Sequence, residues 1–151
     1  MRPASEATSK ASRPLTVPTD QLTSIPLRLA EVRASVAAAC ERAGRDPAEV
    51  TLVGVSKTHP LETVAAALEA GMVDLGENRA QEFVPKASEA TEAGLQPRWH
   101  FIGHLQRNKV RQVLPHLYAL HSVDSERLVE EITRRWELGV RPASGERLRC
   151  Y

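Results

Sequence analysis

The segment LVGVSKTHP, residues 52–60, is an apolar run that ends in a lysine just before the chain turns at a proline. Side chains alternate between the two faces of a strand, so Lys57 would share a face with Val53 and Val55 and lie at its carboxyl end. Functional sites of parallel α/β folds form at the carboxyl ends of the strands. Lys57 is therefore the first candidate functional residue of the chain.

The Lys57 amine has two interpretations. Desolvation lowers the pKa of a lysine, and the uncharged amine can attack an aldehyde to form a Schiff base. Alternatively, the aliphatic stem covers apolar surface while the ammonium group reaches solvent. Position alone favours the second interpretation, because most lysines at such an edge are solvated. The choice depends on which other residues follow the predicted strands.

Composition predicts one soluble globular domain, because 42% of the 151 residues are hydrophobic and 26% are charged. The net charge of +1 provides no overall field that would attract nucleic acid or a membrane surface. No apolar run is long enough to span a bilayer and the amino terminus lacks the apolar core of a secretory signal, so we expect a cytoplasmic protein. Cys40 and Cys150 are isolated in the sequence and are expected to be reduced, structural thiols.

Strands and helices alternate along most of the chain. Residues 1–23, rich in Ser, Thr, Pro and Ala, are predicted to form a disordered arm. Helical spacing of apolar residues predicts an amphipathic helix over 25–44, with Pro26 in its first turn. The predicted strands are 50–56, 72–77, 98–103 and 116–124, each followed by a helix, at 60–71, 78–94, 105–114 and 125–139, and residues 147–151 begin a fifth strand. Ser125 is predicted to cap the last of these helices.

This alternation predicts a parallel sheet flanked by helices. An open doubly wound sheet would fit the chain length, whereas a complete (β/α)8 barrel needs about 250 residues. However, SKTHP follows the first strand where an open dinucleotide-binding sheet would carry a glycine-rich turn. A partial barrel is therefore as well supported as an open sheet.

Small, polar and amide side chains follow each predicted strand. They are Gly76, Glu77 and Asn78 where the second strand ends, Gly103 and His104 where the third ends, and Asp124 and Ser125 where the fourth ends. The motifs SKTHP, GENRAQE, WHFIGHLQRNKVR and HSVDS together strongly resemble the pyridoxal phosphate homeostasis proteins, which share the barrel of the alanine racemase N-terminal domain. The resemblance covers roughly residues 25–151.

The resemblance implies an α/β fold, a partial (β/α)8 TIM barrel of the alanine racemase N-terminal type with four βα units and the start of a fifth strand. Residues 24–151 would then form the amino-terminal half of a barrel that binds pyridoxal 5'-phosphate (PLP). The resemblance also implies that Lys57 holds PLP as an internal aldimine and that Asn78 lies near the cofactor. Proteins of this family are regarded as carriers or regulators of PLP supply, with no established turnover reaction.

Proteins of this family continue past the fifth strand, and the resemblance implies that their phosphate-binding loops lie in that further portion. We therefore expect this chain to bind PLP weakly, or only after assembly with a complementary fragment. The unpaired outer edges of a half barrel also favour self-association of the short form. The full-length form is expected to be a monomer or a weak dimer, without nucleic-acid or membrane partners.

Two other functions stay open at this point. A PLP-dependent, racemase-like enzyme would need a second acid or base facing the cofactor. Tyr118 lies inside a predicted strand and Tyr151 is the terminal residue, so neither is a good candidate. An α/β interaction module without cofactor chemistry is the other alternative. The motif set favours the carrier or regulator over both.

Three further groups of residues receive structural interpretations. His100 and His104 are four residues apart, but they straddle a strand end and no carboxylate completes a ligand set, so no metal site is expected. His100 is instead predicted to pack in or beside the barrel, and His104 to line a loop. The basic side chains of 106–112 are predicted to form a solvated helix face rather than a nucleic-acid site. Trp99 and Trp136 are predicted to be packing residues.

Overall fold

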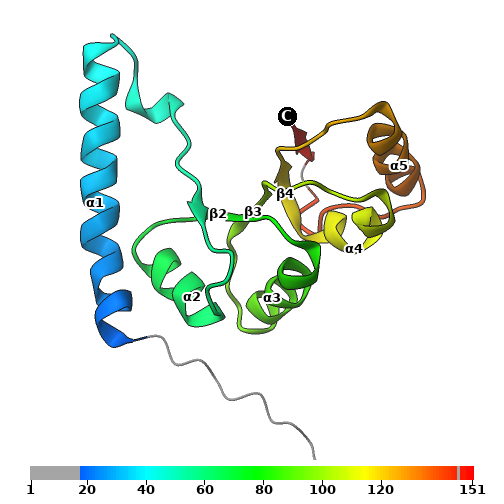
Figure 1. Ribbon diagram of the computed structural model, residues 1–151, viewed down its shortest axis with the longest axis horizontal. Helices are drawn as coiled ribbons and strands as arrows, with labels where there is room; N and C mark the ends of the chain where they lie inside the picture. The colour runs from blue at the N-terminus through cyan, green and yellow to red at the C-terminus, as the bar shows by residue number, and fades with distance from the viewer. Residues whose placement is uncertain (1–17, 146) are drawn as a thin grey trace, which may run out of the picture.

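The computed structural model describes residues 18–145 and 147–151 (Figure 1). The long helix α1 (Thr19–Arg42) stands at one end of the molecule. It contacts α2 (Leu61–Glu69) and the short 3-10 helix η1 (Pro47–Glu49). Leu29 and Cys40 are its buried residues. Most of the surface of α1 therefore faces solvent.

Helix α1 begins earlier than the sequence predicts. Its first residue is Thr19, inside the range 1–23 that is predicted as an arm, and Pro26 consequently lies within the helix instead of in its first turn. Asp20 lies in that first turn, where a carboxylate is stabilised by the helix dipole. The remainder of the predicted arm, residues 1–17, lies outside the described residues.

Five parallel strands form one sheet in the order β1-β2-β3-β4-β5. They are β1 (Gly54–Val55), β2 (Asp74–Glu77), β3 (Arg98–Phe101), β4 (Leu117–Leu120) and β5 (Arg149–Cys150). Each strand pairs with the strand that precedes it in the chain, so the order never reverses. A doubly wound sheet contains such a reversal at its switch point. The open doubly wound alternative is therefore wrong for the described residues.

The helices that connect the strands lie along one side of the sheet (Figure 1). They are α2, α3 (Ala80–Glu92), α4 (Val110–Val113) and α5 (Glu126–Glu137), and each contacts the next. Two 3-10 helices, η2 (Arg107–Lys109) and η3 (Leu114–His116), flank α4. Among the described residues, no helix has the length and apolar character needed to cross a membrane.

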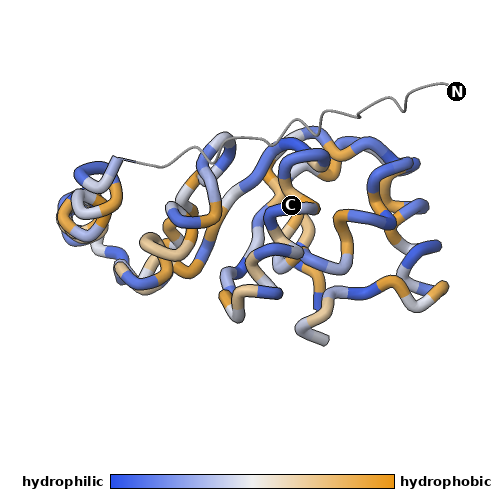
Figure 2. Tube along the Cα trace, turned by 90° about the horizontal axis from the view of Figure 1, so that it is seen from below, coloured by the Kyte–Doolittle hydropathy of each residue, from blue (hydrophilic) through white to orange (hydrophobic). Residues whose placement is uncertain are grey.

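The core lies between the helices and the sheet. Phe83 of α3 is fully buried, and its ring centroid lies 5.6 Å from that of Trp99 and 5.9 Å from that of Phe101. Such tilted and edge-on arrangements suit the charge distribution of aromatic rings. Burying one side chain of this size stabilises the fold by roughly 1.5–3 kcal/mol. Hydrophobic and hydrophilic residues alternate along the helices, as expected for helices that bury one face (Figure 2). The predicted packing role of Trp99 is confirmed.

Several predicted elements are shorter in the structure. Strand β1 has two residues instead of the predicted range 50–56, because it lies at the sheet edge and only Gly54 and Val55 pair with β2. The predicted helix 105–114 is divided into η2 and α4, and Pro115 lies in η3, where its missing N–H cannot continue an α-helix. The predicted fifth strand is confirmed as β5.

Candidate functional site

Lys57 lies in a tight turn directly after β1. The Ser56 carbonyl accepts the backbone N–H of His59 at 3.1 Å, so Lys57 and Thr58 are the central residues of the turn. Thr58 has a φ of 65°, in the left-handed region that this turn position usually gives to Gly or Asn. A residue held there is strained by roughly 1–3 kcal/mol, and such strain persists where surrounding contacts hold it.

The Lys57 amine is accessible to a ligand. The residue is exposed, and within the described part of the chain no hydrogen bond or ion pair engages its Nζ. The amine is therefore not committed to a structural contact.

A buried ion pair between α3 and β2 adjoins this turn. Lys86 Nζ lies 2.6 Å from Glu77 Oε1 and donates a second hydrogen bond, of 2.9 Å, to the Ser56 carbonyl. The Ser56 hydroxyl donates to the same Glu77 oxygen at 2.8 Å. The Glu77 side chain is 0% exposed and that of Lys86 is 11% exposed. One cluster thus joins the end of β1, the end of β2 and helix α3.

Asn78 follows β2 as Lys57 follows β1. Val55 is in register with Gly76, so Lys57 and Asn78 both follow the carboxyl ends of two paired, neighbouring strands. Asn78 Oδ1 is buried and has no hydrogen-bond partner in the described chain. An unsatisfied buried acceptor of this kind suits a donor supplied by a ligand or by water.

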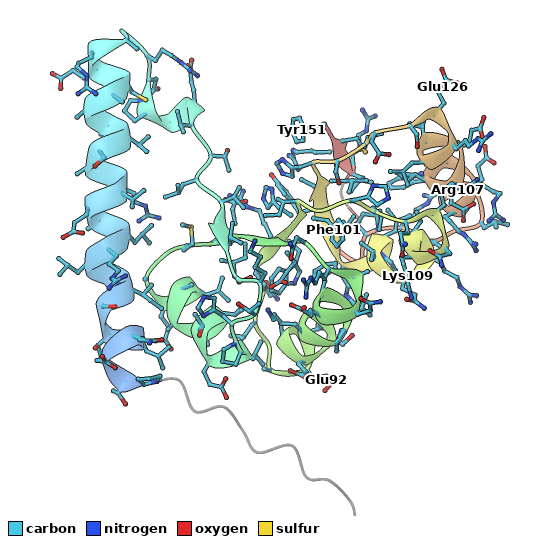
Figure 3. All side chains as sticks on the ribbon, in the orientation of Figure 1. Glu92, Phe101, Arg107, Lys109, Glu126 and Tyr151 are labelled. Carbon is cyan, nitrogen blue, oxygen red and sulfur yellow. The ribbon has the colours of Figure 1, made fainter. Side chains whose placement is uncertain are left out.

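A small basic cavity opens beside Asn78. It has a volume of about 240 Å³ and lies between the loops that follow β2 and β3. Its basic lining residues are Arg79, His104 and Lys109, and amide side chains complete the wall. Lys109 is the last residue of η2, directly before α4 (Figure 3), and its side-chain Nζ has no hydrogen-bond or ion-pair partner among the described residues. This lining suits an anionic group.

A second polar cluster links β2, β3 and β4. Asp74 Oδ1 lies 2.8 Å from His100 Nε2, and His100 Nδ1 lies 2.8 Å from His121 Nε2. Arg98 donates a hydrogen bond of 2.5 Å to the other oxygen of Asp74. A carboxylate can only accept, so an ionised Asp74 requires the proton on His100 Nε2. In a neutral His100, Nδ1 then accepts the N–H of His121.

The environment of this cluster shifts two pKa values. Burial, and then the neighbouring His100, lower the pKa of His121 below its ordinary value. The hydrogen bond to Asp74 raises the pKa of Arg98. Neutral His121 is therefore favoured in the folded chain.

The two histidines considered as metal ligands have different surroundings. His100 is 4% exposed, as predicted, whereas His104 is exposed and its Nδ1 lies 2.7 Å from Asp124 Oδ2. That hydrogen bond lowers the pKa of Asp124 below its usual range. Among the described residues, no group of three or more His, Cys, Asp or Glu side chains is arranged so that it could hold a metal ion.

A groove larger than the cavity beside Asn78 adjoins β1. It has a volume of about 520 Å³ between α1, β1 and α2, and Val55, Ser56 and His59 contribute to its wall. Lys57 itself does not line it. The groove therefore adjoins the turn without containing its amine.

Sequence reasoning did not predict the Lys86–Glu77 pair or the Asp74–His100–His121 chain. The sequence marks Glu77 only as one of the polar residues where a predicted strand ends. A charged residue at the end of a strand that is predicted to be buried is the one signal that could have identified it, because such a group must find a partner when buried.

Comparison with known proteins identifies relatives that share about half of their length with this chain. No family model matches it. The pyridoxal phosphate homeostasis protein of Pseudomonas aeruginosa is 39% identical over 121 residues, which cover 80% of this chain and 52% of the relative. The Escherichia coli protein of the same name is 44% identical over 105 residues, covering 69% of this chain and 45% of the relative.

A solved structure shows the same similarity. PipY of Synechococcus elongatus, determined with PLP bound, is 39% identical, with a TM-score of 0.63, and the match covers 76% of this chain and 50% of PipY. The chain thus spans about half the length of the curated relatives it matches. The resemblance carried by the four motifs is confirmed, and this chain is homologous to the pyridoxal phosphate homeostasis proteins.

Proposed function

We propose that this chain is a PLP-binding protein of PLP homeostasis and that Lys57 is the residue that attaches the cofactor. The observation that carries the proposal is the position of Lys57, an exposed amine without a structural partner among the described residues, at the carboxyl edge of the sheet. The names of the relatives and the PLP bound to PipY support the choice of ligand.

The residues at this edge fit the cofactor chemically. PLP supplies an aldehyde, with which an amine can form a reversible covalent C=N bond. Lys57 contributes the amine: its nitrogen adds to the aldehyde carbon, and the aldehyde oxygen leaves as water. Asn78, directly after the adjacent strand, contributes a buried amide oxygen without a hydrogen-bond partner among the described residues. The two residues follow paired, neighbouring strands at the same edge of the sheet, which is the arrangement expected if both contact one small molecule.

We also propose that the five strands are part of a (β/α)8 barrel. The strand order is consecutive, all strand pairs are parallel, and the connecting helices lie on one side of the sheet. These are the features of a barrel wall, in which every strand neighbours the strand before it. In such a barrel Lys57 and Asn78 face the end at which functional sites form.

Within this proposal the chain acts as a carrier or regulator and not as a racemase-like enzyme. A carrier needs one group that binds the aldehyde reversibly. A racemase needs two groups that exchange a proton with the substrate on opposite faces of the cofactor. The described residues near Lys57 and Asn78 supply an amine and an amide, which meets the first requirement.

Covalent trapping tests the attachment site. The chain has four lysines, Lys10, Lys57, Lys86 and Lys109. After incubation with PLP, borohydride reduction and peptide mass mapping, we expect the label on Lys57, together with an absorption change that is absent from Lys57→Ala. Lys10→Ala is the matched control and should label on Lys57 as the unmodified chain does. Label distributed over all four lysines would contradict the proposal, and racemisation of L-alanine would support the enzyme alternative.

A further inference from the structure

The Ser56 carbonyl accepts two hydrogen bonds, and both bear on the Lys57 turn. One comes from the backbone N–H of His59, at 3.1 Å, and closes the turn. The other comes from Lys86 Nζ, at 2.9 Å, and reaches the turn from helix α3. The carbonyl that begins the turn is therefore held both from within and from a separate element.

The turn needs such support because of Thr58. Its φ of 65° lies in a region where β-branched residues are rarely found. A chain segment in that conformation relaxes to a more ordinary one unless neighbouring groups fix it. Relaxation would move Lys57, because Lys57 and Thr58 share a peptide unit.

The Lys86–Glu77 pair is costly as a purely structural contact. Both charges are removed from water, since Glu77 is 0% exposed and Lys86 is 11% exposed. Glu77 Oε2 is also buried without a partner among the described residues. A well-packed apolar pair usually stabilises a fold as well as a buried ion pair does. An apolar pair, however, could not donate a hydrogen bond to Ser56.

We propose that Lys86 and Glu77 are positioning residues for Lys57. Glu77 orients the Lys86 ammonium group through a 2.6 Å contact, and Lys86 fixes the Ser56 carbonyl. The strained turn then presents the Lys57 amine in one place. The inference rests on the proposed function in that it takes Lys57 as the attachment point for PLP. The positioning itself is a property of the unloaded chain.

The central variant is Lys86→Met, which keeps the length of the side chain and removes the donor. We expect the equilibrium constant for PLP attachment, measured by absorption, to fall by about tenfold, the factor typical of a lost hydrogen bond to a charged group. Glu77→Gln, which keeps the volume and the Ser56 contact, should cause a smaller loss. The control is Arg127→Met, which removes an exposed cation from a different element, α5, and should leave the constant unchanged.

Thr58→Gly distinguishes positioning from general stabilisation. Glycine adopts a positive φ without strain, so the turn should form without support from Lys86. The double variant Lys86→Met/Thr58→Gly should therefore recover most of the PLP affinity lost by Lys86→Met. A purely structural role of the ion pair predicts no recovery. If Lys86→Met fails to fold, Glu77→Gln with and without Thr58→Gly provides the same comparison.

Hydrogen exchange tests positioning without PLP. The backbone N–H of His59 closes the turn, so its exchange should accelerate in Lys86→Met and return toward the original rate in the double variant. Exchange in α5 should be the same in all folded variants. If the unmodified chain fails to attach PLP at Lys57, the proposed function is wrong while this readout still decides the positioning role. An unchanged His59 exchange rate in folded Lys86→Met would overturn the inference.

Discussion

Gly103 occupies a position where no side chain fits. A Cβ atom built there would overlap the backbone carbonyl of Asn78. The obstacle is backbone and not a flexible side chain, so it cannot move aside without displacing the loop that carries Asn78. The absence of a side chain at residue 103 thus allows the loops after β2 and β3 to lie together beside the candidate site.

Gly103→Ala should therefore lower the free energy of unfolding by about 2–3 kcal/mol, as overpacking does when the neighbour cannot yield. Urea titration followed by circular dichroism measures the change. Gly54→Ala is the matched control, because its Cβ would lie 3.2 Å from Cγ of the flexible Met72 side chain. We expect it to cost less than about 1 kcal/mol. Equal losses for both variants would show that the close approach at Gly103 is not maintained in solution.

Helix caps provide a test at the level of the elements. Ser125 precedes α5 at the predicted capping position, yet its side chain makes no capping hydrogen bond. Asp46 precedes the short helix η1, and its Oδ1 accepts the N–H of Ala48 at 2.9 Å. Serine and aspartate are similarly favoured at the capping position. In the structure, however, only Asp46 of these two residues makes a side-chain capping hydrogen bond.

We expect Asp46→Ala to lower the free energy of unfolding by about 1 kcal/mol, the usual cost of losing a capping bond. Ser125→Ala should cost only a few tenths of a kcal/mol, because no such bond is lost. Chemical denaturation of both variants under one set of conditions compares them directly. A larger loss for Ser125→Ala would mean that its hydroxyl caps α5 in solution.

Element types were predictable where local signals are strong. The helix predicted at 60–71 is α2, and Gly71, which follows it, has a φ of 83° that only glycine adopts easily. The start of α1 was not predictable to the same degree, because Thr19 and the residues around it carry weak helix signals. Strand β1 was overestimated, since an apolar segment does not reveal how many of its residues find partners on a neighbouring strand.

In the candidate site, too, some features follow from local sequence signals and others do not. The edge position of Lys57 follows from alternation along one strand, and that of Asn78 from the next motif. The Lys86–Glu77 contact depends on how α3 packs against β2, and the His100–His121 contact crosses a register shift between Trp99 and His100. Neighbouring residues in the sequence indicate neither the packing angle nor the register shift. Both contacts needed the tertiary structure.

Protonation of histidines affects the molecule as a whole. Burial lowers the pKa of His116, and burial together with His100 lowers that of His121, each below the ordinary value of 6.5. As the pH falls through 6.5, the unfolded chain binds protons that the folded chain does not yet bind. The free energy of unfolding therefore increases with pH in this range. The contribution of the two histidines to it is fully present above pH 6.5 and declines below it.

Thermal unfolding between pH 7.5 and pH 5.5 tests this linkage, and we expect the midpoint to fall as the buffer is acidified. The double variant His116→Gln/His121→Gln should show a weaker dependence over the same interval, because the two linked groups are gone. The unmodified chain should show a similar pH dependence of its midpoint in high salt, because desolvation, the first cause of both pKa shifts, is little screened by ions. A midpoint that rises on acidification would contradict the assigned direction.

The consecutive order of the strands also has a consequence for how the chain acquires its structure. Every strand pairs with the strand made just before it, so each step of sheet growth joins segments that are close in sequence. Each connection carries a crossover helix, and pairing every strand with the next keeps these connections shorter than any other strand order would, which limits the entropy lost on closure. Synthesis proceeds from the amino terminus, and amino-terminal parts of a chain generally fold first. The sheet can therefore be extended one βα unit at a time as the nascent chain leaves the ribosome, with each new strand meeting a partner already in place.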